Sequence, residues 1–120
     1  MKLLIVEDNE SMRRTIKSVI GESADEIYEC WDGGEALALY FEHRPDWVLM
    51  DIKLERMDGI EATSRIKALY PEAKIVIVTN YDDQKLKEAA FRAGALRYLL
   101  KRDLLEINQI LNSYEDRSSS

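Results

Sequence analysis

Five polar side chains in this 120-residue chain each follow the end of a predicted β-strand, where they could act together on charged groups. Glu7 and Asp8 follow the first predicted strand, and Asp51 follows the third. Thr79 follows the fourth strand and Lys101 follows the fifth. The carboxyl ends of parallel neighbouring strands meet at one edge of a sheet, so these side chains would gather there. Three ionised carboxylates at one site repel one another and need a compensating cation.

The ligand set predicts which ion would compensate this charge. Carboxylates on short loops, with no His or Cys beside them, suit Mg²⁺, with Mn²⁺ as the alternative. We therefore predict a metal site at Glu7, Asp8 and Asp51. A lysine and a hydroxyl beside a metal can hold the oxygens of a phosphoryl group, so Lys101 and Thr79 would complete a phosphoryl site. Asp51 would be the nucleophile and would form an acyl phosphate.

The elements that would position these side chains follow from the spacing of apolar residues. Helical spacing follows each predicted strand, and residues 26–30 alternate polar and apolar as in an edge strand. This alternation of strands and helices predicts an α/β, doubly wound, flavodoxin-like (βα)5 three-layer fold with a parallel five-stranded sheet of order 2-1-3-4-5. Strands 1 and 3 are then adjacent at the switch point where ligands bind. The predicted strands are residues 3–6, 26–30, 47–50, 74–78 and 96–100.

Acidic residues at the expected helix starts predict three N-caps. Asp58 and Glu61 have the spacing of a capping box. Asp82 is the predicted N-cap of the fourth helix, and Asp103 with Glu106 is predicted to cap the last one.

Breaks in the pattern predict the ends of elements and of the domain. Gly33 and Gly34 are expected to break the chain before the second helix. Residues 1–114 are expected to form one domain, with residues 115–120 as a tail or the start of a linker.

Composition excludes several classes of function for this domain. The net charge of −6 argues against direct nucleic-acid binding. No apolar run approaches the ~20 residues of a membrane span, and no signal peptide is visible. The single cysteine, Cys30, is interpreted as a small buried apolar residue in a reducing compartment. We expect a soluble, cytoplasmic protein.

Four short motifs together resemble the receiver domain of two-component response regulators, over residues 1 to about 114. They are Glu7-Asp8-Asn9, Met50-Asp51-Ile52 with Met57-Asp58-Gly59, Val78-Thr79-Asn80, and Gly94-Ala95 through Tyr98 to Lys101. Residues 80–83 and 94–101 are similar to the LuxR/NarL-type branch, whose receivers usually precede a DNA-binding output domain.

The resemblance implies a role for each residue of the acidic site. Asp51 would accept a phosphoryl group from the phosphohistidine of a sensor histidine kinase or phosphotransfer protein. Asp8, Asp51 and the backbone carbonyl of Lys53 would hold Mg²⁺, with Glu7 acting directly or through water. Lys101 would contact the phosphoryl oxygens. Such a domain is a signalling phosphoacceptor, not an enzyme with an external substrate.

The resemblance also implies a two-state switch. The Thr79 hydroxyl would move toward the phosphoryl group and Tyr98 would turn inward behind it, which would change the face made by helix 4, strand 5 and helix 5. That face would control an output, transcription being the expected one, and a homodimer on phosphorylation is a further expectation.

Three residues depart from the family pattern near the site: Glu55 and Arg102 stand where many receivers have proline, and Asn80 stands in place of a small residue. We expect a trans Lys101–Arg102 peptide bond, because a cis bond before a non-proline residue costs about 3–4 kcal/mol. We also hypothesise that Lys53 and Tyr81 tune the lifetime of the acyl phosphate.

Other functions remain open from the residues alone. A flavodoxin-like module that binds a flavin or nucleotide would need a loop that attracts phosphate, whereas Glu7-Asp8-Asn9-Glu10 would repel it. A phosphatase with an aspartyl-phosphate intermediate typically has a second Asp where this chain has Lys53. A receiver-like interaction domain that is not regulated by phosphorylation is the third alternative.

Overall fold

The central element is a parallel sheet of order β2-β1-β3-β4-β5, as the sequence predicted. The structure is a computed structural model that describes the backbone of residues 1–119 and the side chains of residues 1–113. The strands are β1 Lys2–Val6, β2 Glu26–Cys30, β3 Trp47–Met50, β4 Ile75–Thr79 and β5 Arg97–Leu100. The doubly wound, flavodoxin-like α/β fold is therefore confirmed.

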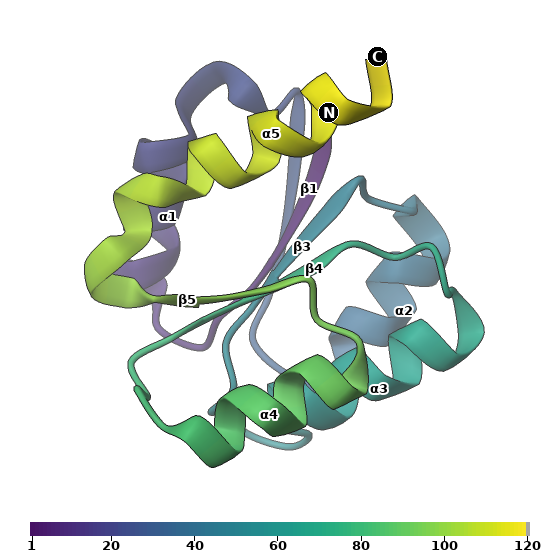
Figure 1. Ribbon diagram of the computed structural model, residues 1–120. Coiled ribbons are helices and arrows are strands. Elements are labelled where there is room, and N and C mark those ends of the chain that lie inside the picture. The colour runs from purple at the N-terminus through teal and green to yellow at the C-terminus, as the bar shows by residue number, and fades with distance from the viewer. Residues whose placement is uncertain (120) are drawn as a thin grey trace.

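Helices cover both faces of the sheet (Figure 1). One face packs against α1 and α5, and the other packs against α2, α3 and α4. The helices are α1 Glu10–Ile20, α2 Gly33–His43, α3 Gly59–Leu69, α4 Gln84–Ala93 and α5 Ile107–Ser119.

Alternate residues of each central strand enter different cores, which explains why these strands are apolar throughout. In β1, Leu3 and Ile5 pack on the α1–α5 side, whereas Leu4 and Val6 pack on the α2–α4 side. β2 lies at the edge of the sheet, as its alternating sequence predicted.

The start of α2 differs from the prediction that glycines break the chain there. Gly33 and Gly34 are its first two residues, and the Asp32 side chain caps it by accepting from the Glu35 backbone N–H at 2.9 Å. A Cβ on Gly33 would lie 2.5 Å from the Met57 carbonyl oxygen. Gly33 is therefore required because the backbones of Gly33 and Met57 come close together, and it does not interrupt the helix.

The N-cap of α4 is one residue later than predicted. Asp83, not Asp82, accepts a hydrogen bond from the Leu86 backbone N–H, at 3.0 Å. Asp82 instead forms an ion pair with Lys87 at 3.0 Å. Gly94 ends the helix with φ of 111°, as its position predicted.

The N-cap of α3 is as predicted. The Asp58 side chain accepts from the Glu61 backbone N–H at 2.9 Å.

The segment after β5, η2 Lys101–Glu106, consists of 3-10 turns that lead into α5. Asp103, with φ of −105° and ψ of 21°, forms a kink between two of these turns. The predicted cap by Asp103 stays a prediction. A second 3-10 turn, η1 Gly21–Ser23, follows α1. The expected domain end at residue 114 and the tail over 115–120 fall among residues 114–120, whose side chains lie outside the described residues.

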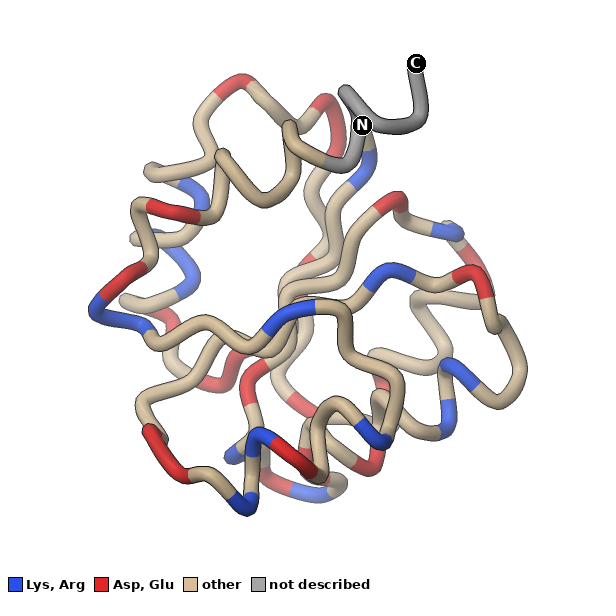
Figure 2. The backbone as a smooth tube through the Cα atoms, viewed as in Figure 1, with Lys and Arg blue, Asp and Glu red and all other residues tan. Residues whose placement is uncertain are grey.

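Charged residues of both signs are distributed over all sides of the fold (Figure 2). Within the described residues, none of the helices has the length and apolar character that a membrane crossing requires.

Candidate functional site

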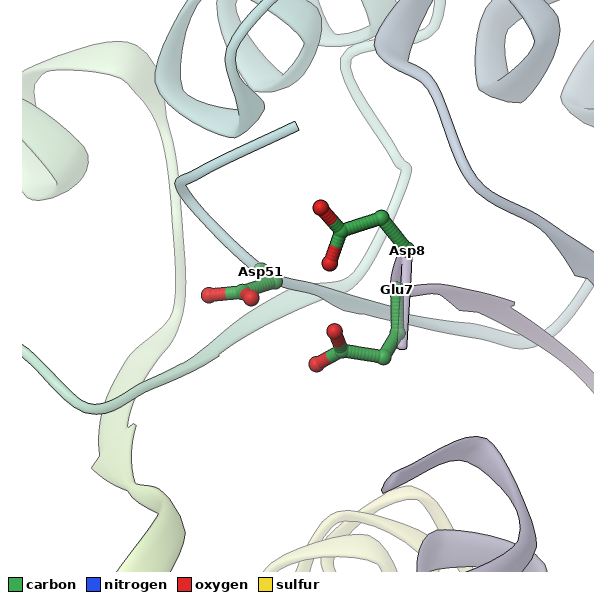
Figure 3. A group of neighbouring side chains, drawn as sticks. All are labelled: Glu7, Asp8 and Asp51. Carbon is green, nitrogen blue, oxygen red and sulfur yellow. The ribbon is translucent and has the colours of Figure 1, made fainter. Parts of the chain in front are cut away.

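Three carboxylates converge at the carboxyl ends of β1 and β3. The two strands pair in parallel with Val6 opposite Met50, so the residues that follow them meet at one edge. Glu7, Asp8 and Asp51 each place a carboxylate oxygen within 4.8 Å of the other two (Figure 3). The predicted metal ligands are therefore brought together by the fold.

Burial makes this cluster costly to ionise. Glu7 is only 2% exposed and Asp51 only 6%, whereas Asp8 is exposed. Burial raises the pKa of Glu7, and the negative charge of Asp51 raises it further, while hydrogen bonds from Lys101 and the Asn9 backbone N–H offset part of the rise. A positively charged group beside these carboxylates would therefore stabilise their ionised forms.

Lys101 supplies the first positive charge. Its Nζ lies 2.7 Å from Glu7 Oε1 and 3.0 Å from Asp51 Oδ2, and its side chain is 13% exposed. Burial alone would lower the pKa of Lys101, but its hydrogen bonds to the two carboxylates outweigh burial and hold the pKa above its ordinary value. When all three carboxylates are ionised, they and the Lys101 ammonium together carry a charge of −2, which one divalent cation would balance.

The backbone around Asp51 is fixed on both sides. The Asp51 N–H donates to the Val6 carbonyl at 3.0 Å, and the Ile52 N–H donates to Asp51 Oδ1 at 2.8 Å. A Cβ on Gly59 would lie 1.9 Å from the Asp51 carbonyl oxygen, so only glycine fits against this loop. The predicted nucleophile is therefore held by contacts that precede any ligand.

Thr79 and Tyr98 are placed differently from the carboxylates. Tyr98 packs against the core on the α2–α4 side of the sheet. Thr79 is fully buried, and neither it nor Tyr98 lines the pocket that contains the carboxylates. The structure thus brings the carboxylates and the lysine into one pocket, which Thr79 and Tyr98 do not line.

Tyr98 is attached to the loop between β4 and α4. Its hydroxyl donates to the Tyr81 carbonyl at 2.6 Å, and the Tyr81 N–H lies 3.5 Å from Thr79 Oγ1. Burial raises the pKa of Tyr98, and the charges of Asp83 and Asp82 raise it further. The tyrosine therefore stays a hydrogen-bond donor at neutral pH.

An open pocket of about 670 Å³ contains the acidic cluster and extends along α1 to η2. Lys53, Asn80, Tyr81 and Arg102 lie on its rim, and the Lys53 ammonium is 5.6 Å from the centre of the Tyr81 ring. Glu55 is exposed on the β3–α3 loop and does not line this pocket. No cis peptide bond occurs among the described residues, so the expected trans Lys101–Arg102 bond is confirmed.

Arg13, a residue that the sequence did not single out, also belongs to the site. One of its terminal guanidinium nitrogens donates to the Glu7 backbone carbonyl at 2.7 Å. The sequence carries little signal for this contact, because one cation on a polar helix face is ordinary. Cys30 is buried next to this region, and burial raises its pKa to about 12, which confirms its interpretation as a buried apolar residue.

Comparison with known proteins identifies the family. Residues 3–112 match the model of the response regulator receiver domain. The response regulator protein VraR of Staphylococcus aureus is 38% identical over 103 residues, which are 84% of this chain and 49% of VraR. The chain therefore spans about half the length of this relative.

Two further relatives match over a larger share of their own length. The chemotaxis protein CheY of Halobacterium salinarum is 37% identical over 100 residues, which are 83% of each chain. The crystal structure of a LuxR-family two-component response regulator from Aurantimonas sp. SI85-9A1 superposes with a TM-score of 0.86 and 33% identity, over 94% of this chain and 83% of that one. The fold, the clustered carboxylates and these matches together show that this chain belongs to the response regulator receiver domain family of two-component systems.

Proposed function

We propose that this chain is a phosphoacceptor that takes a phosphoryl group from the phosphohistidine of a sensor histidine kinase onto Asp51. The observation that carries the proposal is the position of the Asp51 carboxylate, which lies 3.0 Å from the Lys101 ammonium and beside two further carboxylates. The Asp51 side chain is thus placed between a cation for the phosphoryl oxygens and a set of ligands for a metal ion.

The acidic residues fit a bound Mg²⁺, and Mn²⁺ suits the same oxygen ligands. Glu7, Asp8 and Asp51 offer three carboxylates whose oxygens lie within 4.8 Å of one another, and Lys53 on the pocket rim would add its backbone carbonyl. The metal would neutralise the charge that otherwise keeps the Asp51 carboxylate from an anionic phosphoryl group.

The transfer itself follows from the groups on this chain. A carboxylate oxygen of Asp51 attacks the phosphorus in line as the phosphorus–nitrogen bond of phosphohistidine breaks, and the imidazole leaves with that electron pair. Lys101, no longer paired with a free Asp51 carboxylate, turns its ammonium to a phosphoryl oxygen. The Thr79 hydroxyl, which is buried and does not line the pocket before the transfer, would turn toward the same group.

Movement of Thr79 would be transmitted through the loop that follows it. Thr79, Tyr81 and Tyr98 are linked by the contacts already described, so a shift of the hydroxyl changes the surroundings of Tyr98 on β5. The face made by α4, β5 and α5 would then be the readout. This chain modifies only itself, which is the behaviour of a signalling domain.

The output of the switch is proposed to be transcription. The solved structure of a LuxR-family DNA-binding response regulator from Staphylococcus aureus, 27% identical to this chain, and the greater length of VraR support a longer chain with a DNA-binding output domain. In that chain residues 1–114 would form the receiver and residues 115–120 would begin a tail or linker. The receiver itself would not bind nucleic acid, and it would act in the cytoplasm and form a homodimer on phosphorylation.

Intact-mass measurement after incubation with a small phosphodonor tests the proposal. With Mg²⁺ present we expect the wild type to gain one phosphate, and we expect no gain in Asp51→Asn or when EDTA removes the metal. Asp46→Asn is a matched control, because Asp46 is an exposed carboxylate bound to the Lys2 backbone N–H away from the site. A wild type that never gains mass, or an Asp51→Asn variant that does, would contradict the proposal.

A further inference from the structure

Every polar group of Glu7 has a partner, and each partner comes from a different part of the chain. Its N–H donates to the Cys30 carbonyl at 3.0 Å, and its Oε2 accepts from the Asn9 N–H at 3.1 Å. Its Oε1 lies 2.7 Å from Lys101 Nζ. Its backbone carbonyl accepts from Arg13 at 2.7 Å. The first three partners belong to β2, the loop and η2, and Arg13 is the partner that α1 contributes.

Arg13 is itself held in place by β2 and the residue that follows it. Its Nε lies 3.2 Å from Glu29 Oε1, and its guanidinium lies 5.4 Å from the centre of the Trp31 ring. The Arg13 side chain is largely buried. A planar guanidinium can serve two acceptors at once in a fixed geometry, which a lysine ammonium does less well.

The hydrogen bond from Arg13 to the Glu7 carbonyl lies just beyond the end of the backbone hydrogen bonds that join β1 and β2. The register ends with Val6 opposite Cys30, and the Glu7 N–H makes the last backbone hydrogen bond to β2. The Glu7 carbonyl comes one step later and receives its hydrogen bond from Arg13 instead. A carbonyl with no donor in a buried setting costs free energy, and a charge-assisted hydrogen bond is stronger than a neutral one.

We propose that Arg13 is a positioning residue of the metal site, which fixes the main chain of Glu7 and thereby the carboxylates of Glu7 and Asp8. This inference rests on the proposed function for its consequence, because positioning matters if a cation binds there. Arg13 contacts the backbone of Glu7 and not the carboxylates of the cluster. Its effect on the metal would therefore be indirect.

The two possible roles of Arg13, positioning the Glu7 backbone and acting only as a nearby positive charge, predict opposite effects of its removal on Mg²⁺ binding. If Arg13 acted only as a nearby positive charge, its removal would strengthen the binding of Mg²⁺, since a repelling charge would be lost. If Arg13 holds the Glu7 backbone, its removal loosens two ligands and weakens binding. The direction of the change therefore separates the two roles.

The chain offers two matched controls on the same helix. Arg14 follows Arg13, carries the same charge and is exposed. Lys17 pairs with Glu29 Oε2 at 2.9 Å, so Lys17→Met removes a contact of the same glutamate at a position that does not hold the Glu7 carbonyl.

A Mg²⁺ titration followed by amide chemical shifts measures the effect. We expect Arg13→Met to raise the dissociation constant for Mg²⁺ about 10-fold, as loss of an outer-shell partner typically does. We expect Arg14→Met and Lys17→Met to bind at least as tightly as the wild type. Arg13→Lys should recover part of the loss, because an ammonium can reach the Glu7 carbonyl but holds it less rigidly. Binding by Arg13→Met that equals or exceeds that of Arg14→Met would overturn the inference.

Hydrogen exchange in metal-free protein tests whether Arg13 fixes the Glu7 backbone, and its result does not depend on the proposed function. Arg13→Met should exchange the Glu7 and Asn9 amide protons faster than the wild type, whereas Lys17→Met should not. Should Arg13→Met fail to fold, Glu29→Gln provides the second test, because it leaves Arg13 present but weakens its anchor, and the same amides should exchange faster. Unchanged exchange would refute positioning by Arg13 even if the wild type binds Mg²⁺. A wild type that does not bind Mg²⁺ would instead refute the proposed function.

Discussion

The two sides of the pocket that contains the carboxylates are built differently. On the acidic side, Glu7, Asp51 and Lys101 are largely buried, and Lys101 contacts Glu7 at 2.7 Å and Asp51 at 3.0 Å. On the other side, the loop of residues 80–83 between β4 and α4 is exposed. The acidic side therefore has its charges fixed before any ligand arrives, whereas the loop side is free to change its contacts.

Contacts of the loop side support this contrast. Asp82 pairs with Lys87 at 3.0 Å and with Arg102 at 3.5 Å, and these ion pairs are solvent-exposed. The nearby cations lower the pKa of Asp82, chiefly through its hydrogen bond from Lys87. Exposed ion pairs contribute little to stability and exchange easily. The proposed function would use both properties, a rigid acceptor site and a loop that can adopt a second arrangement.

The largest effect should come from crowding the backbone on the acidic side. Gly59→Ala would place a Cβ 1.9 Å from the Asp51 carbonyl oxygen, so the β3–α3 loop must move. We expect the free energy of unfolding to fall by about 3 kcal/mol, measured by urea denaturation. Gly34→Ala is the control, because its Cβ would meet only the Asp32 side chain, at 3.3 Å, and we expect a change below about 1 kcal/mol. Equal effects of the two substitutions would remove the evidence for tight packing around Asp51.

Removal of the Lys101 ammonium should have the next largest effect on stability. In Lys101→Met the buried carboxylates of Glu7 and Asp51 lose their common partner, and we expect metal-free protein to lose about 2 kcal/mol of stability. Added Mg²⁺ should restore part of this loss. Lys87→Met removes an exposed partner on the loop side and should leave the melting temperature unchanged. A smaller loss in Lys101→Met than in Lys87→Met would reverse the proposed contrast between the two sides.

The pH dependence of stability should report the buried carboxylate. Because burial raises the pKa of Glu7 above its unfolded value, Glu7 contributes stability that is full below that unfolded value and is lost as pH rises through the folded pKa. In EDTA, Glu7→Gln should therefore be more stable than the wild type at pH 8, and the difference should shrink as pH falls toward 4.5. Denaturation curves at a series of pH values measure this. A difference that grows on acidification would show that Glu7 is stabilising when ionised.

The smallest effects on stability should come from the rim, where an effect on rate is expected instead. Lys53 and Tyr81 both line the pocket, with the Lys53 ammonium near the Tyr81 ring, and we expect them to flank the approach of water to an acyl phosphate. We expect Lys53→Ala and Tyr81→Ala each to change the dephosphorylation rate while leaving the melting temperature close to that of the wild type. Phosphate release from phosphorylated protein gives the rate. If both variants dephosphorylate at the wild-type rate, the tuning hypothesis should be dropped.

The sheet could be predicted from the sequence because its apolar runs are short, continuous and separated by helical spacing. The bounds predicted for β2 and β3 are those observed. The helix starts were harder to predict because adjacent acidic residues compete for the N-cap, and only the path of the loop decides that Asp83 rather than Asp82 caps α4. The start of α2 was missed because Gly33 is needed for contact with Met57, which is distant in sequence.

The acidic cluster could be predicted because parallel strands bring their carboxyl ends together whatever the side chains do. The burial of Thr79 outside the lining of the pocket that contains this cluster could not be predicted in the same way, because it depends on how the side chains at the end of β4 pack. Arg13 could not be predicted, because its contact with Glu7 depends on how α1 is rotated against the sheet.

The central claim is that Asp51 carries the phosphoryl group, and the chemistry of the linkage tests it most directly. An acyl phosphate reacts with hydroxylamine to leave a hydroxamate on the carboxylate, whereas a phosphate ester does not. Protein incubated with a small phosphodonor and Mg²⁺ should be treated with hydroxylamine, digested and analysed by mass spectrometry. We predict a hydroxamate on Asp51, dependent on both the donor and the metal. A hydroxamate on Glu7 or Asp8 instead, or phosphorylated protein that resists hydroxylamine, would contradict the account.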